Sequence, residues 1–218
     1  MRVVAVNVGM PREVPWEGGV VATGIFKTSV EGPVMVRALN LDGDQQADLT
    51  VHGGPDKAVY AYPGEHYDFW RGEFPGKALA PGMFGENLTT EGLDEESVHI
   101  GDRFRIGEAE LIVTQPRFPC FKLGIKFGDP TMVNRFLASR RTGVYFRVVA
   151  EGSVWPSAPI VLLEREEHQV AVAEFTRLYA FDRGDTATLR RVLEVAALPE
   201  SWVQHFTALL QRAERKRR

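Results

Sequence analysis

Short runs of apolar and β-branched residues alternate with turn residues throughout residues 1–163. Runs of this length, bounded by glycine and aspartate, are typical of β-strands, and the segments between them are too short for crossover helices. The strands that we expect cover residues 3–8, 18–26 (entered through a Gly-Gly turn), 97–100, 103–106, 109–114, 143–150 and 159–163. Two short helices are expected among them, at 63–71 and 131–139. The pattern predicts a mainly β domain, built as a barrel or a sandwich.

From residue 164 onward, the apolar positions change to the spacing of amphipathic helices. They recur at intervals of three and four residues in three sets: Ala171, Phe175, Leu178 and Tyr179; Leu189, Val192, Leu193 and Ala196; Trp202, Phe206, Leu209 and Leu210. Breaks at 182–184 and 198–199 separate the sets. The sequence therefore predicts two domains, a mainly β domain at 1–163 and a three-helix domain at 164–218.

Composition and charge narrow the class of protein. Hydrophobic residues make up 44% of the 218 residues and charged residues 25%, which is ordinary for a globular protein. No apolar run is long enough to span a membrane and no segment resembles a signal peptide, so we expect a cytoplasmic protein with no membrane partner. A net charge of −3 argues against nucleic acid as a partner. The basic stretch at 212–218 is typical of a solvated chain end.

The chain has one cysteine, Cys120. This count excludes an intrachain disulfide, a cysteine-rich zinc site and an iron–sulfur cluster held by this chain alone. Cys120 lies in a proline-bounded segment, QPRFPCFKL, where Arg117 and Lys122 flank it, and nearby cations lower the pKa of a thiol. A lone cysteine can be an inert buried residue, but a thiolate can also be a nucleophile, a sulfur carrier or a soft metal ligand. The residues alone leave these alternatives open.

Two further glycine-containing segments carry candidate chemistry. In residues 50–57, two glycines follow His52, which suits either close approach of the backbone to a ligand or a tight turn. In residues 81–90, Gly85, Asn87 and Thr89 offer donors that suit an anion such as phosphate, although an ordinary Asx-type turn has the same composition. Both interpretations stay open for each segment.

Four motifs, taken together and in order, resemble a known family. They are LDGDQQAD with VHGGPDKAVYAYPGEHY, then FGENLTTEGL, then GDRF, then QPRFPCFKLG. The combination resembles the MOSC domain, which is named after the C-terminal part of molybdenum-cofactor sulfurase. The similarity is greatest to the YiiM-like branch of stand-alone bacterial proteins, in which a small three-helix domain follows the MOSC domain.

The resemblance implies a MOSC-type β-barrel domain that holds the molybdenum cofactor, a molybdopterin with molybdenum, and it implies no pyridoxal phosphate. By analogy with the family, Cys120 would be the molybdenum ligand and, with His52, a catalytic residue. The residues that the resemblance assigns to cofactor binding are Lys27, which lies in FKTSVEG, together with His52, Gly85, Glu86, Asn87, Thr89 and Arg117.

The activity that the resemblance implies is reduction of N-hydroxylated compounds, such as hydroxylaminopurines, amidoximes and hydroxylamines, as a detoxification. Electrons would come from a separate flavoprotein reductase, and the oligomeric state, monomer or homodimer, stays open. Two alternatives remain. In one, Cys120 carries sulfur as a persulfide; in the other, the chain is a non-enzymatic binding or carrier module for the molybdenum cofactor.

Overall fold

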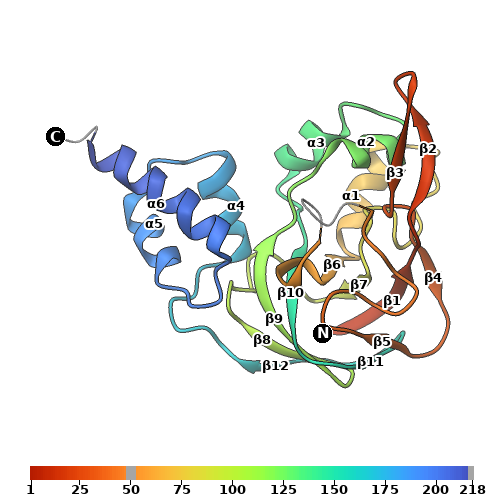
Figure 1. The fold of residues 1–218 in the computed structure, drawn as a ribbon, viewed down its shortest axis with the longest axis horizontal. Helices are drawn as coiled ribbons and strands as arrows, with labels where there is room; N and C mark the ends of the chain where they lie inside the picture. The colour runs from red at the N-terminus through yellow and green to blue at the C-terminus, as the bar shows by residue number, and fades with distance from the viewer. Residues whose placement is uncertain (48–52, 216–218) are drawn as a thin grey trace.

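A curved eight-stranded sheet forms most of the protein (Figure 1) in the computed structural model, which describes residues 1–47 and 53–215. The order across the sheet is β12 (Ile160–Glu164), β8 (Arg103–Ile106), β9 (Ala109–Pro116), β10 (Val144–Ala150), β6 (Val59–Pro63), β7 (Leu88–Glu91), β1 (Arg2–Val8) and β4 (Thr28–Val30). Neighbouring strands are antiparallel except β6 and β7, which are parallel. Between these two strands in the chain lies α1 (His66–Glu73). Parallel neighbours need such a crossover.

The sheet curls so that the start of β12, at one edge, meets β1, the strand next to the other edge. An isolated bridge joins Arg2 to Pro159, and the backbone N–H of Val3 donates to the carbonyl of Ala158 at 2.9 Å. The expected mainly β, barrel-like domain is therefore confirmed. It is not a regularly closed barrel, because β1 and β12 are joined by these few bonds at their ends and not by a continuous ladder.

One predicted strand is wrong. Residues 97–100 form turns, and the only pairing there in the described chain is an isolated bridge between His99 and Ala171. The reason is that a buried side chain takes the place of a neighbouring strand: the N–H of His99 donates to Asp102 at 2.9 Å. The other expected strands and both expected helices are present, with boundaries shifted by a few residues.

Smaller elements surround the sheet. β2 (Arg12–Trp16) and β3 (Gly19–Thr23) form the hairpin that projects from the body in Figure 1, and β5 (Val34–Val36) pairs with β11 (Gly152–Val154). A short 3-10 helix, η1 (Pro55–Lys57), precedes β6. α1, α2 (Phe121–Phe127) and α3 (Met132–Ser139) pack on each other through a separate aromatic core, which includes Tyr62, Tyr67, Trp70, Phe84, Phe127 and Phe136.

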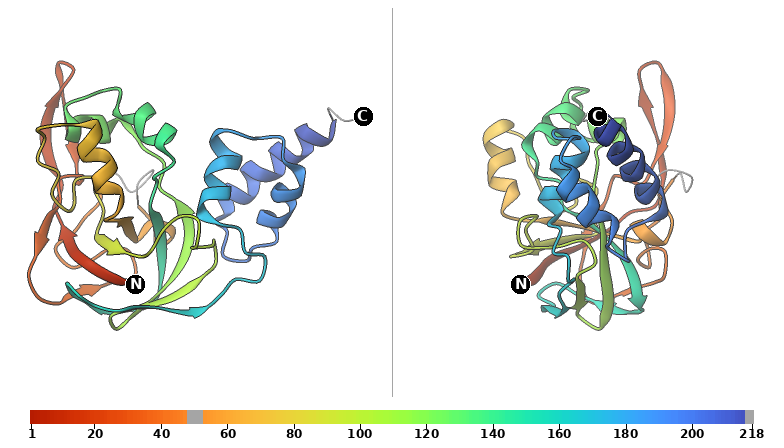
Figure 2. Two further views of the ribbon diagram at one scale, coloured as in Figure 1. Left: turned by 180° about the vertical axis from the view of Figure 1, so that it is seen from behind. Right: turned by 90° about the vertical axis from the view of Figure 1, so that its left-hand side faces the viewer.

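The three expected C-terminal helices are present as α4 (Val172–Ala180), α5 (Thr186–Leu193) and α6 (Glu200–Arg215). They lie together on one side of the sheet (Figures 1 and 2). Their buried side chains, such as Phe175 and Phe206, belong to the same hydrophobic cluster as Val113 and Phe146 of the sheet. The exact boundary at 163/164 stays a prediction. Within the described ranges, no helix is both long and apolar enough to cross a membrane.

A buried carboxylate fixes the connection between the sheet and these helices. Asp102 is fully buried and accepts the N–H groups of His99 and Glu166, at 2.9 and 3.1 Å. It also accepts a bond from the Arg165 guanidinium at 2.8 Å. One side chain thus joins the turn before β8 to the segment that leads into α4.

We expect Asp102→Ala to lower the free energy of unfolding by about 3 kcal/mol, because the substitution leaves two backbone N–H groups and a partly buried guanidinium without their acceptor. Chemical denaturation measures this loss. The control is Asp68→Ala, which breaks an exposed ion pair with Arg71 and should cost less than about 1 kcal/mol. Equal stability of the two variants would contradict the anchoring role.

Candidate functional site

Two neighbouring strands bring the floor of a pocket together. Tyr145 of β10 lies opposite Tyr60 of β6, and β9 pairs with the other edge of β10. The rings of Tyr60 and Tyr145 are 5.1 Å apart, centroid to centroid. Because directly opposite residues project from the same face of a sheet, these side chains form one polar, aromatic surface. β9 then ends, and the chain continues directly into Arg117 and Cys120.

A pocket opens above these side chains, with a volume of about 580 Å³ that includes open solvent. It is lined by Thr23, Gly24, Ile25, Lys27, Gln45, Gln46, Ala47, Lys57, Tyr60, Gly85, Asn87, Arg117, Cys120, Lys122 and Tyr145. In the described part of the chain, the charged residues of this lining are all cationic: Lys27, Lys57, Arg117 and Lys122. The pocket is therefore suited to an anion. We call it the cysteine pocket.

Cys120 is half-buried in the wall of this pocket. Its backbone is extended, and α2 begins at the next residue, with the N–H of Leu123 donating to the Cys120 carbonyl at 2.9 Å. The sequence pattern missed α2, because the prolines before Cys120 favour an irregular loop and seven helical residues carry little periodicity. The helix fixes the backbone on one side of the thiol, and β9 fixes the chain on the other.

Arg117 is the most constrained cation of the pocket. The residue is only 5% exposed, and its guanidinium carbon lies 5.6 Å from the Tyr60 ring centroid and 5.2 Å from that of Phe136. Burial opposes its charge, but Tyr60, Tyr145 and Cys120 more than offset that cost and raise its pKa. Its Nη1 is buried and finds no hydrogen-bond acceptor among the described residues. A buried cationic donor without an acceptor favours binding of an anion at this point.

Lys27 reaches the pocket from the segment before β4 and forms an ion pair with Asp44. Burial lowers the pKa of Lys27, and the neighbouring Asp44 counteracts this effect. Asp44 in turn accepts hydrogen bonds from Gly9 N–H and from the Asn87 amide, both at 2.9 Å. The Lys27 ammonium is thus held at the pocket by a fixed carboxylate.

Asn87 lines the pocket, and its side-chain amide forms hydrogen bonds within the protein. Its amide oxygen accepts the N–H of Tyr60 at 3.1 Å, while its amide nitrogen donates to Asp44. Its own backbone N–H donates to the Tyr60 carbonyl at 2.8 Å. Asn87 therefore positions both Tyr60 and the Lys27–Asp44 pair, and its expected direct contact with a phosphate stays a prediction.

Glu86 and Thr89 do not line the pocket but lie behind it. The Glu86 carboxylate is fully buried and accepts the N–H groups of Gly82 and Phe84, at 2.8 and 3.0 Å, and the hydroxyls of Tyr67 and Thr89. Burial raises the pKa of Glu86, although these donors favour its charged form. Glu86 and Thr89 therefore stabilise the loop behind the pocket.

Gly85 belongs to that same loop and does reach the pocket surface. It has φ +81°, and a β-carbon there would lie 2.8 Å from Cγ1 of Ile25, so larger residues fit neither its backbone nor its space. The remaining candidate, His52, lies outside the described residues, and its expected catalytic and binding roles stay predictions.

Three lining residues, Lys57, Tyr60 and Tyr145, were not among the site residues expected from the sequence. Lys57 ends the motif that contains His52, so the motif itself was a signal. The tyrosines are brought together by strand register, which one sequence does not display.

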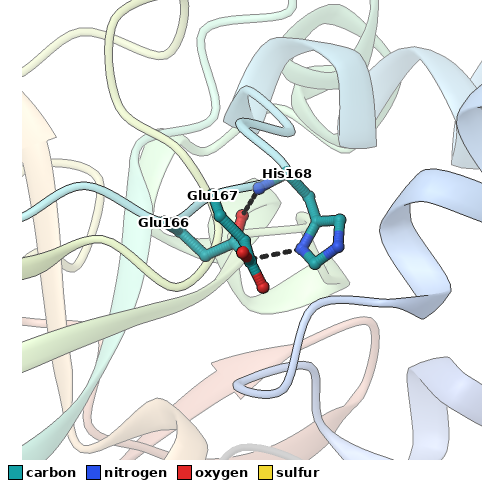
Figure 3. A group of neighbouring side chains, drawn as sticks. All are labelled: Glu166, Glu167 and His168. Atoms are coloured by element: carbon teal, nitrogen blue, oxygen red, sulfur yellow. Dashed lines mark hydrogen bonds and ion pairs between the residues drawn. The ribbon is translucent and has the colours of Figure 1, made fainter.

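A cluster of potential metal ligands, Glu166, Glu167 and His168, lies in the segment before α4 (Figure 3). The Glu166 carboxylate accepts the N–H groups of His168 and Gln169, at 2.7 and 3.0 Å. Its other oxygen lies 2.7 Å from Nδ1 of His168. Since these contacts close a local turn, we interpret the cluster as support for that segment.

The chain is similar to known proteins over both of its parts. Residues 48–161 match the family model "MOSC domain", and residues 170–213 match "YiiM-like, 3-alpha helix domain". The chain is 46% identical over 204 residues to "Uncharacterized protein YflK" of Bacillus subtilis, covering 94% of this chain and 92% of that protein. The crystal structure of YiiM from Geobacillus stearothermophilus superposes with a TM-score of 0.81 at 35% identity, over 96% of this chain and 98% of that one. A "Reductase" of Gibberella moniliformis is 35% identical over 84% of this chain but only 32% of its own length.

Lys126 of α2 yields a pH-dependent prediction. Burial, helped by Arg12 and Lys27, lowers its pKa to about 8. Between about pH 8 and 10.5 the unfolded chain then binds more protons than the folded one, so this residue makes the free energy of unfolding rise with pH in that window. Denaturation over this range should show a smaller rise for Lys126→Met than for the parent protein or for Lys77→Met. An unchanged rise in Lys126→Met would refute the assignment.

Proposed function

The chain belongs to the MOSC-domain family, in its YiiM-like branch, and from this premise we propose that it is a molybdenum-cofactor-dependent reductase of N-hydroxylated compounds. MOSC domains are a molybdenum-cofactor-related family. The observation that carries the proposal is the buried Arg117 Nη1, which finds no acceptor among the described residues and lies in the wall that also contains Cys120.

The residues of the cysteine pocket fit this cofactor chemically. Molybdopterin is an anion with a phosphate group, and the pocket offers four cationic side chains and a buried guanidinium donor with capacity for an acceptor. Molybdenum bound by sulfur is a soft centre, and the pocket supplies one thiol that can complete such a ligand set. Cys120 would hold the metal, while Arg117 and Lys27 would hold the anionic part of the cofactor.

The cofactor, when bound, supplies the redox step, in which an N-hydroxyl compound takes up two electrons and two protons and yields an amine and water. The protein residues position the reactants. Tyr145 lines the pocket beside Arg117, and burial raises its pKa, so its hydroxyl keeps its proton at neutral pH. Tyr60 is fixed differently, since its hydroxyl donates to the Thr142 carbonyl at 2.9 Å.

We further propose that the two electrons come from a separate flavoprotein reductase. The single cysteine leaves this chain unable to hold an iron–sulfur cluster of its own for the relay. The similarity to about a third of a Gibberella protein named "Reductase" supports a role in reduction. A cytoplasmic location is part of the same proposal.

The first test is the molybdenum content of Cys120→Ser, purified from a host that makes the cofactor. Loss of the soft ligand should lower the metal per chain about tenfold, with N-hydroxyl reduction lost in parallel. Asp68→Asn, exposed and outside the pocket, should keep both the metal and the activity.

The same measurements distinguish the alternative functions. A persulfide carrier would work without molybdenum, and a cofactor carrier would bind the metal without reducing any N-hydroxyl compound. Negligible metal and no reduction by reconstituted wild-type protein would overturn the proposal.

The second test removes the buried cation. Arg117→Met keeps much of the side-chain length without charge, and we expect cofactor retention through gel filtration to fall about tenfold, because the phosphate loses a charge-assisted donor. Arg117→Lys should fall between this variant and wild type. Arg2→Met, at an exposed ion pair, is the control. Retention in Arg117→Met that equals the control would contradict the anion-binding role.

A further inference from the structure

The segment that carries the thiol is attached to the three-helix domain. We call residues 117–120, between β9 and α2, the cysteine loop. Arg117 lines the cysteine pocket, whereas the next side chain, Phe118, packs on the helices. The Phe118 ring centroid lies 4.2 Å from that of Tyr179 on α4 and 5.5 Å from that of Trp202 on α6. Consecutive residues of one short loop thus contact the pocket and the helical domain.

A hydrogen bond makes a second attachment just before the loop. Nε1 of Trp202 donates to the Gln115 side-chain oxygen at 2.5 Å. Gln115 is 3% exposed, and its amide nitrogen donates to the Asp56 carbonyl at 3.4 Å. The same indole therefore packs on Phe118 and bonds to the strand end three residues earlier. Aromatic pairs stabilise beyond the area that they bury, so these contacts together can hold a short loop in one conformation.

Two prolines make the loop stiff, so the position of Phe118 affects the position of the thiol. Pro116 and Pro119 fix their own φ angles and restrict the residues that precede them. The loop between them has few backbone conformations. A displacement of the Phe118 ring therefore moves Arg117 on one side and Cys120 on the other.

We propose that the three-helix domain is a positioning element for the site: Tyr179 and Trp202 hold Phe118, and Phe118 fixes the Cys120 thiol beside the Arg117 guanidinium. Phe118 and Trp202 are positioning residues, because they act through the loop. The inference goes beyond the proposed function and does not depend on it, since it concerns the arrangement of the thiol and the cation whatever ligand they bind.

The test measures alkylation of Cys120 by iodoacetamide as a function of pH in full-length, metal-free protein. Since Cys120 is the only cysteine, the reaction reports on this thiol alone. In Phe118→Ala we expect the midpoint of the rate profile to move up by about one pH unit, because the thiolate loses a fixed neighbouring cation. Trp202→Phe keeps an aromatic ring but removes the N–H, and should shift the midpoint less in the same direction.

The matched control is Leu189→Ala. Leu189 is fully buried in α5 and contributes to the same hydrophobic cluster, so this variant destabilises the helices without removing a group that touches the loop. The pH profile of its alkylation rate should match that of wild type. In Phe118→Leu, the midpoint should lie between those of Phe118→Ala and wild type. Thermal unfolding identifies the variants that are folded at the assay temperature, and Phe118→Leu and Trp202→Phe keep the test valid if Phe118→Ala is not.

Superimposable profiles for wild type and the folded Phe118 and Trp202 variants would overturn the inference. An equal shift in Leu189→Ala would also overturn it, since general loosening would then explain the effect. Because no molybdenum is involved, either outcome leaves the proposed reductase function to its own tests.

Discussion

The site is organised around the buried guanidinium of Arg117, whose Nη1 has no hydrogen-bond acceptor among the described residues. Burial of a guanidinium is costly unless aromatic faces, opposite charges or acceptors compensate for it. At Arg117, the rings of Tyr60 and Phe136 and the neighbouring thiol supply part of that compensation, while Nη1 keeps capacity for an acceptor. The fold tolerates this cost in the wall of a cationic pocket. An anion bound there would satisfy the donor and would lie beside the thiol.

The rest of the molecule maintains this arrangement in layers. Strand register sets the two tyrosines, and Asn87 connects Tyr60 to the Asp44–Lys27 pair. Behind them, the buried carboxylate of Glu86 accepts hydrogen bonds from backbone N–H groups of its own loop. These bonds fix that loop next to the pocket. On the far side, the three-helix domain packs on the cysteine loop. Few residues face the pocket, and many more determine where those few lie.

Local sequence patterns predicted part of this fold and missed the strands β2, β4, β5, β6, β7 and β11. Short apolar runs bounded by turn residues located β8 at its observed bounds, and helical spacing located α4, α5 and α6. The errors have physical causes. Residues 97–100 have a strand-like composition, but Asp102 binds their backbone from within the chain, and α2 is too short and too close to prolines to show periodicity.

The site was predictable in part. Motifs identified Cys120, Arg117, Lys27, Gly85 and Asn87, which the fold brings to one pocket, and the resemblance to the MOSC family is confirmed. Glu86 and Thr89 lie in the same motif, yet neither lines the pocket, because membership of a motif does not determine which side chains face a site. Tyr145 becomes a site residue only through long-range pairing. X-ray absorption at the molybdenum K-edge tests the central claim most directly: the Cys120→Ser protein, reconstituted with cofactor, should show one sulfur neighbour fewer than wild type, and an unchanged sulfur count would contradict the account.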